Sequence, residues 1–209
     1  VPQPTPADDE VLVRVHAASI NPFDAAVVAG YVAFMAAVPM TVGTDFAGEV
    51  VEAGKDVTHV KPGDEVYGLS ILHSGTFAEY TTPKAHEVAL KPRSLDYVQA
   101  AAIPLAATAA WQTLFDTAQL KNGEHLLIQG VGGSVGTYAL QFAKSAGAYV
   151  YGTDIPERAD LVNGMGLDCY VNHKQERVPD VVKDMDAVLD LVGGDRVQES
   201  YSVLRRGGR

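Results

Sequence analysis

The sequence has a single cysteine, Cys169, among its 209 residues. One thiol excludes an internal disulfide and a four-cysteine zinc site, so we expect a reducing, cytoplasmic location. Positive charge is also scarce: 16 Lys and Arg stand against 26 Asp and Glu, a formal net charge of −10. An acidic surface repels polyanions, which argues against a nucleic-acid partner and against docking on anionic lipid.

Long apolar runs are missing too. No stretch approaches the roughly 18 consecutive apolar residues that a membrane span needs, so no membrane association is expected. The remaining composition is ordinary, with 47% hydrophobic and 20% charged residues. That balance is typical of a globular protein with one large domain or two modest ones.

Residues 1–94 are predicted to form a small β-rich domain. Short strand-like runs are separated by turns that contain Gly or Pro. Asp24 is expected to be the N-cap of a short apolar segment that forms either a helix or an irregular loop at residues 24–35. The predicted strands cover residues 10–15, 46–51, 65–67, 75–82 and 88–90.

Residues 95–209 have a different pattern, in which strands alternate with helices. Such alternation predicts βαβ units and an α/β fold with a doubly wound parallel sheet, covered by helices on both faces. The predicted helices cover residues 97–118, 134–146, 157–165 and 196–204, and the strands cover 125–129, 149–151, 167–171 and 186–191.

A glycine-rich loop, Gly130–Gly136, lies between a predicted strand and a predicted helix. Such a bend brings backbone amides and the positive end of a helix to a diphosphate. The strict dinucleotide pattern would have glycines at positions 131, 133 and 136, and Val131 departs from it. Glycine loops also end strands for purely structural reasons, so the loop alone leaves both interpretations open.

Asp154 strengthens the nucleotide interpretation. It lies 21 residues after Gly133, at the end of the next predicted strand, where a carboxylate accepts hydrogen bonds from the adenosine ribose. The two features together predict a nucleotide-binding βαβ unit. A methyltransferase is the alternative, but it usually lacks a glycine such as Gly136 and a β-rich N-terminal domain.

The choice between NAD(H) and NADP(H) stays open. The carboxylate of Asp154 would repel the 2′-phosphate of NADP and so favours NAD. Arg158, His173 and Lys174 would instead gather positive charge around that phosphate. Alternatively, Arg158 is simply a solvated helix residue.

Several motifs occur in order along nearly the whole chain, and together they resemble the zinc-independent quinone oxidoreductase branch of the medium-chain dehydrogenase/reductase superfamily. The motifs lie at residues 18–24, 43–48, 63–68, 75–80, 105–111, 130–136, 191–194 and 204–208. The resemblance implies a GroES-like domain at 1–94, a Rossmann domain at 95–209, a nicotinamide cofactor and a homodimer. Members of this branch are longer at both ends, so we expect a part of a longer protein; a truncated product with exposed sheet edges is the alternative.

The resemblance also implies that there is no zinc. Zinc-dependent relatives place a cysteine near Ser19 or Ile20 and the sequence Gly-His-Glu where Gly43-Thr44-Asp45 stands here. Without a metal Lewis acid, the expected reaction is hydride transfer from a nicotinamide to a quinone or an α,β-unsaturated carbonyl. In both acceptors the incoming negative charge is delocalised onto oxygen.

By resemblance, Asn21 and Asp24 lie near the nicotinamide, and Thr108 contacts the reactive end of the cofactor. Tyr31 is the candidate proton donor or enolate stabiliser, and Asn21 is the second candidate catalytic residue. The other predicted cofactor-binding residues are Gly130, Gly133, Ser134, Val135, Gly136, Thr153, Asp154, Arg158, His173, Val192 and Gly193.

These roles have structural alternatives. Tyr31 would be a loop aromatic that packs on Phe34 and Met35, Asn21 a turn residue, and Thr108 a helix residue with a buried hydroxyl. At the level of function, the alternative to an enzyme is a non-enzymatic relative, crystallin-like or trafficking-like, that binds nucleotide without turnover.

Overall fold

The computed structural model describes residues 2–32, 34, 38–71 and 73–209. The chain divides into two compact units, Val1–Leu105 and Ala106–Arg209. The domain boundary predicted from the sequence, between residues 94 and 95, precedes helix α2 (Tyr97–Ala101). Among the helices of the described residues, none is long and apolar enough to cross a membrane.

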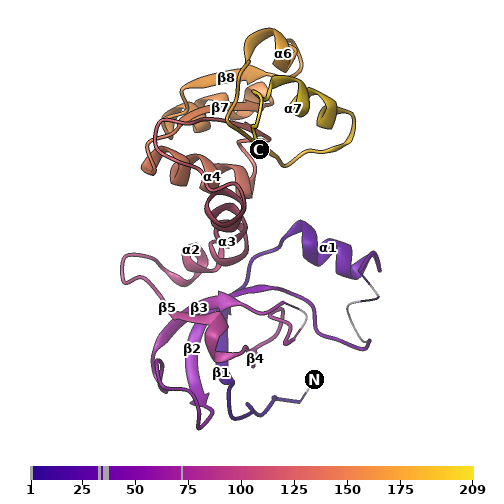
Figure 1. Cartoon of the computed structure of the whole chain (residues 1–209). Coiled ribbons are helices and arrows are strands. Elements are labelled where there is room, and N and C mark those ends of the chain that lie inside the picture. Colours follow the sequence, from indigo (N-terminus) through magenta and orange to yellow (C-terminus); the bar gives the residue numbers. More distant parts are fainter. Residues whose placement is uncertain (1, 33, 35–37, 72) are drawn as a thin grey trace. The chain divides into compact units, whose positions relative to one another are not determined.

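The first unit contains a five-stranded antiparallel sheet in the order β4-β1-β2-β3-β5 (Figure 1). Val11, Val13 and Phe46 are fully buried in its core, and Leu12 between the two valines is buried as well. The expected β-rich domain is therefore confirmed. The strands are β1 (Val11–Ala17), β2 (Asp45–Ala53), β3 (Glu65–Leu69), β4 (Tyr80–Thr81) and β5 (Val88–Leu90).

The strand predicted at residues 75–82 is mostly wrong, because only β4 forms there. The N–H groups of Thr76 and Phe77 donate instead to the carbonyls of Gly43 and Val42. Gly75 lies so close to Thr41 that a Cβ atom would be 2.0 Å from the carbonyl oxygen of Thr41. These contacts hold the segment against the loop before β2.

Helix α1 (Pro22–Val28) begins two residues before the predicted helix. Asn21 is the N-cap and Pro22 takes the first helical position, where a missing N–H costs nothing. The prediction that Asp24 is the N-cap is therefore wrong. Asp24 is the third helical residue, and its carboxylate accepts a 2.7 Å hydrogen bond from the N–H of Asn21.

The helical segment predicted at residues 97–118 forms, and it is interrupted before Pro104. Helix α2 ends at Ala101, helix α3 (Pro104–Trp111) begins at Pro104, and a π-helical turn follows at Gln112–Thr117. Proline has no N–H to donate and its ring clashes with the preceding turn of a helix. Pro104 is therefore the first residue of a new helix.

The second unit contains a four-stranded parallel sheet in the order β8-β7-β6-β9, of which Figure 1 labels β7 and β8. Its strands are β6 (His125–Gln129), β7 (Tyr149–Asp154), β8 (Cys169–Asn172) and β9 (Ala187–Asp190). Its helices are α4 (Ser134–Ser145), α5 (Ala159–Gly164), α6 (Val178–Val181) and α7 (Val197–Val203). The short helix α6 has no counterpart in the sequence prediction.

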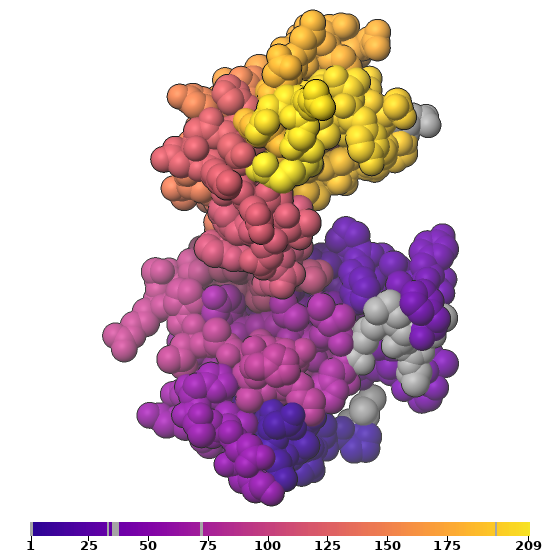
Figure 2. All heavy atoms as spheres, viewed as in Figure 1, coloured from indigo at the N-terminus to yellow at the C-terminus, as the bar shows by residue number. Residues whose placement is uncertain are grey.

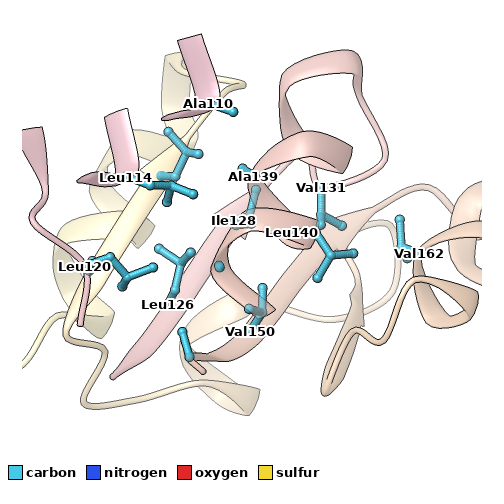
Figure 3. Packing of buried hydrophobic residues seen from close by; sticks show 14 residues of the cluster. Ala110, Leu114, Leu120, Leu126, Ile128, Val131, Ala139, Leu140, Val150 and Val162 are labelled. Carbon is cyan, nitrogen blue, oxygen red and sulfur yellow. The ribbon is translucent and has the colours of Figure 1, made fainter. Parts of the chain in front are cut away.

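Both faces of the parallel sheet are covered. In β6, Leu126 and Ile128 pack with Leu140 of α4 (Figure 3), whereas Leu127 between them packs with Val178 of α6 and with α7. The segment that carries α7, coloured yellow, reaches the surface of this unit (Figure 2). A strand whose apolar residues are buried under helices on both faces is what a doubly wound sheet requires, so the predicted α/β class is confirmed.

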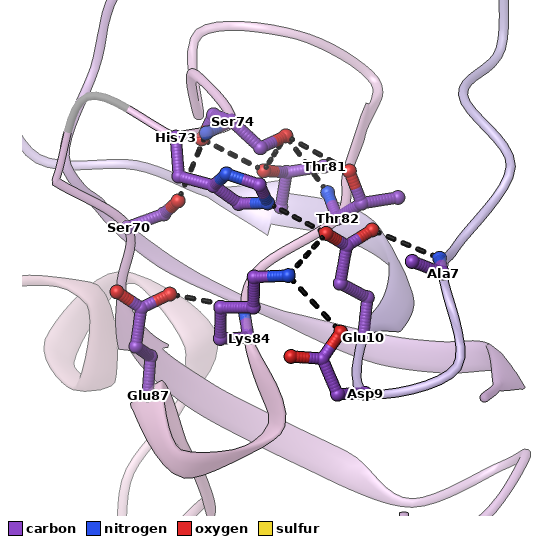
Figure 4. Close-up of polar contacts among 10 residues, drawn as sticks. All are labelled: Ala7, Asp9, Glu10, Ser70, His73, Ser74, Thr81, Thr82, Lys84 and Glu87. Atoms are coloured by element: carbon purple, nitrogen blue, oxygen red, sulfur yellow. Dashed lines mark hydrogen bonds and ion pairs between the residues drawn. The ribbon is translucent and has the colours of Figure 1, made fainter. Parts of the chain in front are cut away.

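In the first unit, a buried carboxylate joins the segment before β1 to the segments that flank β4. Glu10 accepts hydrogen bonds from the N–H of Ala7 (2.9 Å), Nε2 of His73 (2.8 Å) and Nζ of Lys84 (2.9 Å) (Figure 4). Burial raises the pKa of Glu10, but these hydrogen bonds outweigh burial and lower the pKa below its usual value. The network secures the β4 edge of the sheet.

Asp186 plays a similar part in the second unit, next to β9. Its carboxylate accepts a 2.8 Å hydrogen bond from the N–H of His125, at the start of β6, and another from Arg205. The bond from His125, and after it the guanidinium of Arg205, holds the pKa of Asp186 below its usual value.

We expect Asp186→Asn to lower the free energy of unfolding by about 1–2 kcal/mol near neutral pH, because the hydrogen bonds lose their charged acceptor. The folded-state pKa lies below the unfolded-state value, so this stabilisation is complete above the unfolded pKa and is lost as pH falls through the folded pKa. Urea titrations of the two proteins should therefore converge in acid. The exposed Asp160→Asn is the control, and a pH-independent difference for Asp186→Asn would contradict the prediction.

Candidate functional site

The glycine loop of the second unit is fastened to the end of β7. The N–H groups of Gly130 and Val131 both donate to the carbonyl oxygen of Thr153, at 2.9 and 3.1 Å. The N–H of Gly133 turns back to the carbonyl of Gly130 at 3.0 Å. The loop therefore has a defined shape without any ligand.

Helix α4 starts at the end of this loop with its first amides open. Gly133 is the N-cap and has no side chain to cap the helix. No described residue accepts a hydrogen bond from the N–H groups of Ser134, Val135 or Gly136, and Ser134 is exposed. Unpaired amides at the positive end of a helix bind anions. These three predicted residues therefore fit a phosphate group.

At two glycines of the loop, neighbouring atoms lie so close that a side chain would clash with them. A Cβ atom on Gly136 would lie 2.4 Å from the carbonyl oxygen of Gly130. A Cβ atom on Gly132 would lie 2.7 Å from Cδ of Arg158 and 2.9 Å from Oδ2 of Asp154. Close packing, and not a left-handed conformation, is the reason for glycine at both positions.

Asp154 is bound to the loop. Its Oδ2 accepts a 2.7 Å hydrogen bond from the N–H of Gly132, and its Oδ1 accepts a 2.8 Å bond from the N–H of Ile155. The side chain is almost fully buried at the carboxyl end of β7. The bond to Gly132 was not among the sequence predictions. Each carboxylate oxygen can accept a further hydrogen bond, so the side chain can still bind a ribose. That contact stays a prediction.

Each of the three residues expected to gather positive charge, Arg158, His173 and Lys174, has a partner within the chain. Arg158 lies 3.7 Å from Oδ1 of Asp154, and Lys174 lies 3.9 Å from Glu157. Nδ1 of His173 lies 2.8 Å from Nη2 of Arg196, which must donate because a guanidinium cannot accept. Arg196 was not anticipated from the sequence.

Thr153, Val192 and Gly193 lie where the parallel strands end. The hydroxyl of Thr153 is buried and has no hydrogen-bond partner among the described residues. The N–H groups of Val192 and Gly193 donate to Oδ1 of Asp190 at 3.0 and 2.8 Å. Burial raises the pKa of Asp190, but these bonds and one from Ser200 hold it below its usual value. The edge formed by the strand ends is where ligands bind in open parallel sheets.

Thr108 lies on α3 and is exposed. The alternative in which its hydroxyl is buried is therefore wrong. No hydrogen bond within the described chain joins Thr108 to the glycine loop, so its contact with a cofactor stays a prediction.

In the first unit, Asn21 belongs to a cluster of five polar residues, of which all but Ser19 are buried. Asp45 accepts hydrogen bonds from Oγ of Ser19 (2.6 Å) and Nδ2 of Asn21 (2.8 Å). Asp24 accepts one from Oγ1 of Thr44 (2.7 Å) in addition to that from Asn21. Burial raises the pKa of Asp45, the nearby Asp24 raises it further, and the hydrogen bonds partly offset both.

Tyr31 is not part of this cluster. Its side chain is 81% exposed, and its hydroxyl bonds to no described residue. Phe34 is 86% exposed as well, so Tyr31 is not buried against it, and Met35 lies outside the described residues. The role of Tyr31 as proton donor stays a prediction.

The donors at residues 43–45 do not match those of zinc. Zinc sites are built mainly from Cys and His, whereas Thr44 and Asp45 offer oxygens that are already hydrogen-bonded. Across the part of the chain that the structure describes, no group of three or more His, Cys, Asp or Glu side chains is arranged to hold a metal ion.

A hollow of about 630 Å³ in the first unit is separate from these residues. Glu10, His73, Ser74 and Tyr80 are among the residues that line it, and no predicted site residue does so. The sequence prediction and the hollow therefore point to different places.

Residues 7–93 match the family of the alcohol dehydrogenase GroES-like domain, and residues 134–209 match the family described as zinc-binding dehydrogenase. The solved quinone oxidoreductase from Coxiella burnetii is 33% identical in sequence and superposes with a TM-score of 0.91. The match covers 100% of this chain and 68% of that one. The chain belongs to the quinone oxidoreductase branch of the medium-chain dehydrogenase/reductase superfamily. The predicted family, with its GroES-like and Rossmann domains, is confirmed.

Two curated relatives match almost the whole chain. The mitochondrial NAD(P)H oxidoreductase RTN4IP1 of Bos taurus is 36% identical over 220 residues, which cover 95% of this chain and 56% of the relative. The chloroplastic NADPH-dependent alkenal/one oxidoreductase of Arabidopsis thaliana is 33% identical over 216 residues, which cover 97% of this chain and 54% of the relative. The chain thus spans just over half the length of these relatives.

We expect Gly136→Ala to weaken nucleotide binding and to lower the free energy of unfolding by about 1–3 kcal/mol, because the added methyl group overpacks the loop. Titration with ADP-ribose and thermal unfolding measure the two effects. Gly164→Ala in α5 is the matched control, since a Cβ atom there meets nothing within 4 Å. Unchanged binding in a folded Gly136→Ala protein would contradict the loop as the phosphate site.

Proposed function

We propose that this chain belongs to an enzyme that binds a reduced nicotinamide dinucleotide and reduces quinones or α,β-unsaturated carbonyls without zinc. The observation that carries the proposal is the row of open amides at Ser134, Val135 and Gly136, on a loop fixed to the end of β7. The names of the relatives, which include a quinone oxidoreductase and an alkenal/one oxidoreductase, support the reaction class.

The second unit would hold the dinucleotide through several groups. The amides of Ser134 and Val135 would bind its diphosphate, as helix N-termini do. Asp154 would accept a hydrogen bond from the adenosine ribose with lone pairs that its bonds to Gly132 and Ile155 leave available. The unpartnered hydroxyl of Thr153 and the turn at Val192 would adjoin the same ligand.

When bound, the reduced nicotinamide supplies a hydride; the acceptor gains the hydride and a proton, and the dinucleotide becomes oxidised. Quinones and enones need no metal for this step, because their oxygen takes the negative charge. The exposed hydroxyl of Tyr31 is the proposed proton source. The homodimer and the cytoplasmic location expected from the sequence stay predictions.

The reaction is tested by mixing the full-length protein with NADH or NADPH and a panel of quinones and enones. We expect the absorbance of the reduced nicotinamide to fall with at least one acceptor, and chelation of metal ions to leave the rate unchanged. Cofactor binding without consumption across the panel would favour the non-enzymatic alternative. A rate abolished by chelation and restored by zinc would contradict a zinc-free reaction.

We further propose that NADH is preferred to NADPH, because the buried carboxylate of Asp154 repels a 2′-phosphate. Asp154→Asn should raise the affinity for NADPH relative to NADH about tenfold, a change of ~1.4 kcal/mol. Fluorescence titration with both nucleotides measures the ratio, and the exposed Asp160→Asn is the control. Wild-type protein that binds NADPH more tightly than NADH would contradict this preference.

A further inference from the structure

Asp190, the last residue of β9, holds the turn that follows this strand. Its Oδ1 accepts hydrogen bonds from the N–H groups of Val192 at 3.0 Å and Gly193 at 2.8 Å. The N–H of Leu191 donates to the carbonyl of Gln129, the last residue of β6, at 3.2 Å. Three successive amides of the β9 turn, residues 191–193, are therefore used within the second unit. The turn offers a ligand its side chains and carbonyl groups instead.

The second oxygen of the Asp190 carboxylate joins the β9 turn to helix α7. Oδ2 accepts a hydrogen bond from the hydroxyl of Ser200 at 3.1 Å, and this hydroxyl accepts one from Nε2 of Gln129 at 2.6 Å. Ser200 is 7% exposed and Gln129 is fully buried, so water has little access to these bonds. Because both oxygens are engaged, the carboxylate has little freedom to turn away from the amides that it accepts.

The β9 turn packs against the start of the glycine loop. A Cβ atom on Gly130 would lie 3.2 Å from Cγ2 of Val192 and 3.7 Å from Cβ of Leu191. Gly130 is itself anchored at the end of β7, because its N–H donates to the carbonyl of Thr153 at 2.9 Å. The side chain of Val192 is nevertheless half exposed. It therefore lies beside the glycine loop at the carboxyl edge of the sheet, where ligands bind in open parallel sheets.

We infer that Asp190 is a positioning residue for the dinucleotide: it holds the side chain of Val192 beside the glycine loop, where that side chain contacts the ligand. This inference rests on the proposed function and adds to it a residue that acts through the β9 turn. The amides of the turn are already used, so its contact with the ligand is apolar. The open amides of α4 bind the diphosphate, and Val192 packs on an uncharged part of the same molecule.

Asp190→Ala and Val192→Ala in the full-length protein test the inference through the affinity for ADP-ribose, measured by calorimetric titration. We expect Asp190→Ala to weaken binding about tenfold, because the turn is no longer held against the glycine loop. Val192→Ala keeps the backbone hydrogen bonds and removes only the apolar contact, so a loss of about threefold is expected. The double variant should bind as weakly as Asp190→Ala alone, because Asp190 acts through Val192.

Three comparisons separate positioning from a general loss of stability. Asp168→Ala removes a carboxylate that accepts the N–H of Val150 at 2.6 Å near the amino end of β7, so it should lower stability and leave the affinity unchanged. Asp190→Asn keeps an oxygen that can accept from the turn, so it should recover most of the affinity that Asp190→Ala loses. Hydrogen exchange at the amides of Val192 and Gly193 should be faster in Asp190→Ala than in Asp168→Ala.

The outcomes for the inference and for the proposed function differ. A wild type that does not bind ADP-ribose would defeat the proposed function. If the wild type binds, three results would overturn the inference alone: unchanged affinity in folded Asp190→Ala, an equal loss in Asp168→Ala, or losses in Asp190→Ala and Val192→Ala that add. If Asp190→Ala does not fold, Val192→Ala decides, since weaker binding supports the contact and unchanged binding overturns it.

Discussion

The hydrogen bond between the N–H of Gly132 and the carboxylate of Asp154 determines the shape of the glycine loop. Together with the bonds from Gly130 and Val131 to Thr153, it makes three successive amides of the loop bind to the end of β7. The chain can then turn into α4 with only the amides of the first helical turn left open. Everything inferred about an anionic ligand depends on this division between satisfied and open amides.

Local pattern was sufficient where the residues of a segment favour a single conformation. The strand at residues 125–129 was predicted to the residue, because a short apolar run between turns has one reasonable conformation in a βαβ unit. Prediction failed where distant contacts decide the conformation. The amides of Thr76 and Phe77 bind to residues 42 and 43, and no property of the sequence at 75–82 reveals that.

The same limit applies to the site. Residue types and spacing were enough to single out the glycine loop and Asp154. They did not reveal that Asp154 accepts a hydrogen bond from Gly132. Asp45 was noted only in the comparison with zinc-dependent relatives, and its hydrogen bond from Asn21 was not foreseen. The partners of Asp45 lie 24, 26 and 60 residues away, at Asn21, Ser19 and Leu105. Tertiary packing, which single-sequence patterns do not encode, brings them together.

The cluster around Asn21 is built entirely from residues of one compact unit. The side-chain amide of Asn21 is therefore ordered when the unit folds, and the entropy is lost at that stage. A side-chain amide held by such hydrogen bonds is already immobile, so little rotamer freedom remains to be lost on association. Preorganisation of this kind favours geometric selectivity, because an unsuitable group cannot induce the amide to turn and accommodate it.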